Sequence, residues 1–253
     1  MPFYEFHDEI LRWYDHWLKG IDTGIMDEPP VKLEIRTGGM ERYAFRFENE
    51  WPIARTQWTR LYLDAANNTL ATSAPAEARV AFKALDSDGI TFSTPPLEKE
   101  TEITGPVAVK LFVSSSTADA DIFVILRVFR PDGSEVVFKG AVDPHTPVAH
   151  GWLRASHRKL DPAKSLPYRP YHAHNERQLL EPGKPVVCEV EIIATSMVFK
   201  KGHKIRLDIS PADGVGTQHF THHHSDYNQG GTSTIHSGGD KQTYLLLPII
   251  PPK

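Results

Sequence analysis

The hydrophobic positions near the start of the chain recur at the spacing of an α-helix. Between residues 6 and 19 the apolar side chains follow one another three or four positions apart, which predicts an amphipathic helix ending at Gly20. Acidic residues in its first turns and Lys19 before the glycine suit the helix dipole and a glycine C-cap. Its apolar stripe consists of Phe6, Ile10, Trp13, Tyr14, Trp17 and Leu18. A large exposed aromatic patch marks an interface, so we expect this stripe to lie against a partner.

From residue 31 onward the pattern changes to the alternation of β-strands. The candidate strands cover residues 31–35, 43–47, 58–63, 79–84, 107–113, 122–129, 135–139, 186–193, 205–209 and 244–250. Most of the prolines and glycines lie between these runs, as turn residues do. We therefore predict a mainly β fold, a two-sheet jelly-roll β-sandwich of galactose-binding-like type, preceded by one amphipathic helix. The predicted units are the helix at 1–20, a linker at 21–30 and the sandwich at 31–253.

The segment from residue 141 to 179 interrupts this series of strands. It is rich in proline and histidine and shows few strand signals, which indicates a structured excursion or a functional loop. We interpret its histidines as hydrogen-bonding loop residues. The alternative is that His157 or His172 faces a neighbouring domain.

Composition excludes several classes of function. The net charge is -4 with both signs spread along the chain, which argues against a nucleic-acid-binding face. No apolar run approaches the roughly 20 residues that a membrane span needs, and no secretory signal pattern opens the chain. We expect a soluble cytoplasmic protein with no membrane partner. The single cysteine, Cys188, alternates with apolar residues in a strand pattern and is interpreted as a buried structural thiol.

Catalytic and cofactor motifs are missing from the sequence. There is no G-x-S-x-G elbow, no glycine-rich phosphate loop, no H-E-x-x-H and no C-x-x-C, so we expect no cofactor. Ser134 falls in a predicted hairpin turn, and Ser114 to Ser116 fall at a strand end, where hydroxyl groups close turns and loops. These serines are not interpreted as nucleophiles.

Histidines are concentrated between residues 219 and 224. His222 and His224 are the weak candidates for a transition-metal site there, since neutral imidazoles are good ligands. Neighbouring side chains of an extended segment point to opposite faces, so this spacing does not make a rigid site. We expect a polar surface loop and no resident metal.

Short motifs that run in order down the whole chain resemble those of the CocE/NonD hydrolase family. That family contains cocaine esterase, α-amino acid ester hydrolases and X-Pro dipeptidyl-peptidases. The matching segments are residues 12–20 (RWYDHWLKG), 28–31 (EPPV), 101–106 (TEITGP), 113–116 (VSSS), 119–121 (DAD), 131–133 (PDG), 153–158 (LRASHR), 182–183 (PG), 202–207 (GHKIRL) and 244–251 (YLLLPIIP).

The resemblance implies a jelly-roll domain that follows an α/β-hydrolase domain and helps to wall its substrate pocket. The helix at 1–20 is then expected to be the last element of that catalytic domain, whose other elements this sequence does not contain. The family's catalytic serine, aspartate and histidine all precede the helix at 6–19, so none can be assigned here; His7 and His16 lie on that helix. The chain alone is therefore expected to be inactive, with a catalytic domain or a second copy of itself as its partner.

Two other functions remain open. One is an independent ligand- or carbohydrate-binding module, whose exposed aromatic rim would be Trp51, Trp152 and Phe220. The other is a structural homo-oligomer formed through the N-terminal helix.

Overall fold

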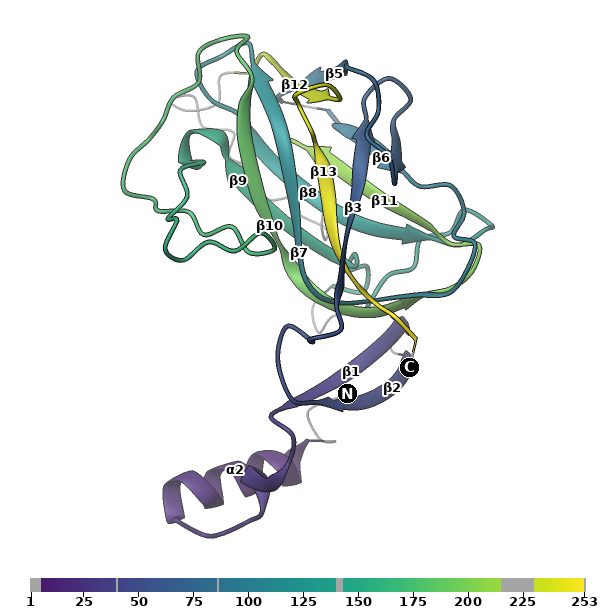
Figure 1. Ribbon diagram of the computed structural model, residues 1–253, viewed down its shortest axis with the longest axis vertical. Coiled ribbons are helices and arrows are strands. Elements are labelled where there is room, and N and C mark those ends of the chain that lie inside the picture. Colours follow the sequence, from purple (N-terminus) through teal and green to yellow (C-terminus); the bar gives the residue numbers. More distant parts are fainter. Residues whose placement is uncertain (1–5, 40, 86, 140–142, 215–229, 253) are drawn as a thin grey trace.

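One helix precedes a series of strands. The structure, a computed structural model, describes residues 6–39, 41–85, 87–139, 143–214 and 230–252. Helix α2 spans His7–Lys19 and ends at Gly20, whose left-handed backbone (φ 70°) forms the C-cap. A 3-10 turn, η1 (Ile25–Asp27), follows in the linker. The strands, shown in Figure 1, are β1 (Val31–Gly38), β2 (Glu41–Glu48), β3 (Gln57–Asp64), β4 (Thr69–Ala71), β5 (Ala78–Lys83), β6 (Ile90–Ser93), β7 (Thr101–Ser115), β8 (Asp121–Phe129), β9 (Ala149–Arg154), β10 (Val186–Phe199), β11 (Lys204–Ser210), β12 (Thr232–Ser237) and β13 (Tyr244–Ile250).

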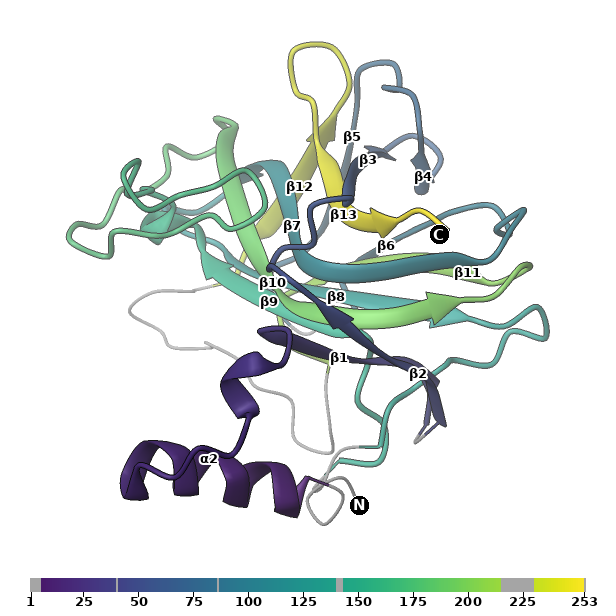
Figure 2. The same cartoon turned by 60° about the horizontal axis from the view of Figure 1, so that its bottom comes forward.

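The strands form one curled sheet. Within the described residues the hydrogen-bonded order is β2-β1-β10-β7-β13-β3-β4-β6-β11-β8-β9, and β12 pairs with β5 and β7. Because the sheet curls, β9 returns to lie alongside β10 (Figures 1 and 2). A Cβ atom at Gly151 of β9 would lie 2.0 Å from the carbonyl oxygen of Glu191 of β10, so this approach needs a glycine. The predicted fold class, mainly β with one N-terminal helix and a sandwich-like sheet, is confirmed.

The hydrophobic core lies inside the curled sheet. Alternate residues of β7 face it, namely Val107, Val109, Leu111 and Val113. Strand β8 is buried along almost its whole length, as its continuous apolar run predicted. Burial of each large apolar side chain stabilises the folded state by about 1.5–3 kcal/mol. The core residues all belong to the sandwich, so it has a hydrophobic core without the helix.

The structure corrects the strand prediction in several places. Strand β9 lies inside the segment 141–179 that was interpreted as an excursion, and the short strands β4, β6 and β12 were not predicted. Residues 135–139 form only isolated bridges, among them Glu135 with Phe129, rather than a full hairpin strand. Strand β9 was missed because its inward positions include Ala149 and Gly151, which give almost no hydrophobic signal.

Candidate functional site

The apolar stripe of helix α2 is exposed. No residue of the helix is buried, and Trp13, Tyr14 and Trp17 are 50%, 53% and 55% exposed. The helix lies beyond the β1–β2 hairpin, away from the body of the sandwich (Figure 1). Between the helix and η1 lies an open hollow of about 600 Å³, lined by Phe6, Glu9, Ile10, Trp13, Tyr14 and Ile25. The stripe therefore contributes nothing to the core of this chain.

The outer face of strand β2 extends this apolar surface. Tyr43, Phe45 and Phe47 alternate along β2 and are 52%, 36% and 46% exposed. Phe6 joins the two elements, since its ring packs edge-on against Phe45 with the centroids 6.0 Å apart. We call the helix stripe and these three β2 residues together the docking surface.

Polar contacts hold the helix in place. Arg12 Nη1 lies 2.7 Å from Glu28 Oε1, and Arg12 also donates to the carbonyl oxygen of Thr23 at 3.1 Å and 3.3 Å. The Thr23 hydroxyl donates back to the Arg12 carbonyl at 3.1 Å. Lys32 of β1 pairs with Glu9 of the helix. These contacts anchor the helix, and Lys32 also lies over the rings of Phe6, Phe45 and Phe47. The tryptophans of the helix stay exposed.

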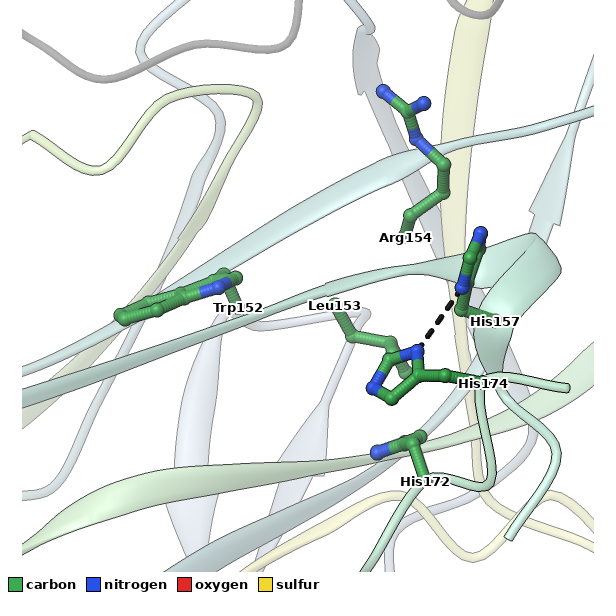
Figure 3. Close-up of a pocket in the computed structure, with 6 residues that line it drawn as sticks. All are labelled: Trp152, Leu153, Arg154, His157, His172 and His174. Atoms are coloured by element: carbon green, nitrogen blue, oxygen red, sulfur yellow. Dashed lines mark hydrogen bonds between the residues drawn. The ribbon is translucent and has the colours of Figure 1, made fainter.

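A second site is a groove on the outer side of β9, which we call the histidine groove. Trp152, Leu153, Arg154, His157, His172 and His174 line a pocket of about 380 Å³ (Figure 3). Trp152, His172 and His174 also line an adjoining hollow of about 610 Å³ that reaches Tyr171 and Glu191. Trp152, which the sequence offered as part of an exposed aromatic rim, lies on β9 and is 52% exposed; a ligand-binding role for it stays a prediction.

The groove brings together histidines that the sequence keeps apart. His157 Nδ1 and His174 Nδ1 lie 3.1 Å apart, and the rings of His172 and His174 have centroids 5.9 Å apart. Burial, followed by the neighbouring imidazoles of His174 and His157, lowers the pKa of His172. His172 is therefore neutral at neutral pH.

A serine and a histidine also meet inside the sandwich. Ser114 Oγ of β7 lies 2.8 Å from His236 Nε2 of β12. Ser114 is only 5% exposed, and the carboxylate of nearby Glu77 binds Lys241 at 3.0 Å. Within the described residues no hydrogen bond links Glu77 to His236, so the pair lacks the carboxylate that orients the imidazole of a hydrolytic triad. We interpret it as a cross-strand structural bond.

The remaining candidates are scattered or lie outside the described residues. Trp51 is 42% exposed in the loop after β2. Phe220, His222 and His224 fall outside the described residues. Among the residues that the structure does describe, no group of three or more histidines, cysteines or carboxylates is arranged to hold a metal ion. Cys188 is buried, as predicted.

Comparison with known proteins decides the family. A profile of the X-Pro dipeptidyl-peptidase C-terminal non-catalytic domain matches residues 23–246. The chain belongs to this family. The X-Pro dipeptidyl-peptidase C-terminal domain is the non-catalytic portion of CocE/NonD-type hydrolases, which confirms the resemblance seen in the sequence.

Similar proteins are longer than this chain. Proteins of Mycobacterium bovis and Mycobacterium tuberculosis named as serine esterases are 30% identical over 84% of this chain and 37% of their own length. Cocaine esterase of Rhodococcus is 25% identical over 94% of this chain and 45% of its own length. A solved CocE/NonD family hydrolase of Staphylococcus aureus has a TM-score of 0.86 and 26% identity, covering 97% of this chain and 46% of that one. The chain thus spans less than half the length of these relatives.

No helix among the described residues is long and apolar enough to cross a membrane.

Proposed function

We propose that this X-Pro dipeptidyl-peptidase C-terminal domain packs on an α/β-hydrolase catalytic domain and helps to wall its active site. The substrates of the whole protein would be acyl esters or X-Pro peptides. The observation that carries the proposal is the docking surface, whose aromatic residues other than Phe6 are exposed although the sandwich has a core of its own without them. The relatives support it, since each has more than half its length outside the matched region.

The energetics favour a covered docking surface. At about 25 cal/mol per Å², burial of a few hundred Å² of aromatic surface contributes several kcal/mol before the costs of association. That gain holds for any complementary apolar partner, including a second copy of the chain. The catalytic domain is the partner we infer, because the family places such a domain next to this one.

We also propose that the chain alone hydrolyses nothing. The Ser114–His236 pair lacks a carboxylate hydrogen-bonded to the imidazole and an exposed hydroxyl, so its geometry does not activate Ser114 as a nucleophile. The cytoplasmic location expected from the sequence stays a prediction.

Co-purification tests the proposal. The reading frame and the gene next to Met1 are searched for a G-x-S-x-G hydrolase domain, and that domain is produced together with this chain. We expect the two proteins to form a complex that hydrolyses p-nitrophenyl acetate. The variant Trp13→Asp/Trp17→Asp should no longer form this complex. Trp152→Asp, an exposed tryptophan outside the docking surface, is the control and should leave the complex intact.

Two results would contradict the proposal. One is turnover by the purified chain alone that disappears in Ser114→Ala. The other is a light-scattering measurement in which the chain stays a dimer through its helix even when the catalytic domain is in excess.

A further inference from the structure

The histidine groove lies outside the docking surface on which the proposed function rests. Three imidazoles, those of His157, His172 and His174, gather beside Trp152 at the surface of the domain (Figure 3). Docking on a catalytic domain through α2 and β2 gives these side chains no role.

The imidazoles of His157 and His174 are spaced as two ligands of one metal ion are. Their Nδ1 atoms lie 3.1 Å apart. Two nitrogens that bind one tetrahedral ion at about 2.0–2.1 Å are separated by about 3.3 Å, nearly the same distance. As a hydrogen bond, the same contact requires one Nδ1 to carry a proton and the other to accept it. Binding of an ion would instead need both protons on Nε2, which is a change of tautomer with no change in charge.

The backbone holds both histidines firmly. His157 ends the 3-10 turn η2 (Ala155–His157), in which the backbone N–H of Ser156 donates to the carboxylate of Asp119 at 2.9 Å. His174 has a left-handed backbone (φ 51°), a strained conformation for a residue other than glycine. The N–H of the adjacent Ala173 donates to the carbonyl oxygen of Lys159 at 2.9 Å, and this bond fixes the loop backbone next to His174. The backbone that carries the two histidines is therefore held before any ligand arrives.

The surroundings suit a partly hydrated ion. The pocket is open to solvent, which leaves room for water ligands. The guanidinium of Arg154, which also lines it, is paired with the carboxylate of Asp121 at 2.9 Å. Next to the pair, His172 Nε2 is buried without a hydrogen-bond partner among the described residues. Among the described residues, no three histidines, cysteines or carboxylates are arranged to bind one ion. The site therefore consists of His157 and His174 alone.

We propose that His157 and His174 bind one divalent transition-metal ion through their Nδ1 atoms, with water in the remaining positions. Imidazole nitrogen suits Zn²⁺ and Cu²⁺, and Cu²⁺ should bind more tightly, following the usual order of affinities. An ion with open positions at the domain surface would be available to bridge to a ligand or to a partner.

Calorimetric titration of the untagged chain with Zn²⁺ and with Cu²⁺ at neutral pH tests the site. We expect one ion per chain, with affinity reduced about tenfold or more in His157→Ala and in His174→Asn. Asparagine is chosen at position 174 because it tolerates the left-handed backbone, so the variant should keep its fold. X-ray absorption of the loaded wild-type chain should show imidazole ligation.

Matched variants separate this site from the other histidines. His150→Ala, in the hollow that adjoins the pocket, and His222→Ala/His224→Ala should both retain binding. The proposal is overturned if no ion binds, or if the affinity survives in His157→Ala and His174→Asn and is lost in His222→Ala/His224→Ala.

Discussion

The guanidinium of Arg12 and the carboxylate of Glu28 form an ion pair, 2.7 Å from Nη1 to Oε1, that ties helix α2 to the linker between η1 and β1. Both side chains are more than a third exposed, so the pair adds at most about 1 kcal/mol to stability. Its effect is on orientation, since Arg12 also binds the carbonyl oxygen of Thr23 in the linker.

Arg12→Ala should loosen the helix without weakening the sandwich. We expect the linker at 21–30 to be cleaved several times faster by a protease under native conditions, because the bonds to Thr23 and Glu28 are lost. The urea midpoint of the sandwich should stay unchanged. Lys19→Ala removes an ion pair within the helix, the one with Asp15, and is the matched control. Equal cleavage rates in the two variants would contradict an anchoring role for Arg12.

Ser114→Ala should destabilise the domain and change no activity. The substitution leaves Nε2 of buried His236 without its partner, at a cost of about 1–3 kcal/mol. Urea unfolding followed by tryptophan fluorescence measures the loss. The esterase rate of the complex with a catalytic domain should be the same as for the wild type, and a selective loss of that rate would point to a catalytic Ser114.

Stability should fall as the pH drops through the range in which an unperturbed histidine takes up its proton. Burial, followed by the charges of Lys241 and Arg79, lowers the pKa of His236 below its usual 6.5. The unfolded state therefore takes up a proton first on acidification, and the folded state loses stability as the pH falls from 6.5 to the folded pKa. Urea midpoints at about pH 7.5 and about pH 5.5 should differ less in His236→Asn than in the wild type. His7→Asn, at an exposed histidine, is the control and should change nothing.

The sequence predicts those helices and strands whose hydrophobic pattern and end signals lie within the element itself. The helix was predicted almost to the residue, because its spacing and Gly20 C-cap are local features. The buried strand β8 was predicted for the same reason. Strand β9 was not, since exposed Trp152 and small Gly151 hide its alternation.

The two polar contacts, between His157 and His174 and between Ser114 and His236, could not be predicted from the sequence. His157 and His174 are 17 positions apart in a segment without periodicity, and Ser114 and His236 are 122 apart on different strands. The course of the loop brings the two histidines together, and the antiparallel pairing of β12 with β7 brings Ser114 to His236. The segment's histidines were predicted to form hydrogen bonds in a loop, which His157 and His174 do, but their gathering in one groove was not predicted.

Gly151→Ala tests the close approach of β9 and β10 that supports the histidine groove. The new Cβ would lie 2.0 Å from the Glu191 carbonyl oxygen, a backbone atom, so the two strands must separate. Overpacking of this kind costs about 1–3 kcal/mol, which urea unfolding would detect. Because β9 carries Trp152, the fluorescence of the folded state should change as well. Ile193→Ala, at an exposed neighbour on β10, should stay within about 0.5 kcal/mol of the wild type. A Gly151→Ala variant as stable as that control would show that the strands have room to move apart, and that the groove is less firmly held than these contacts indicate.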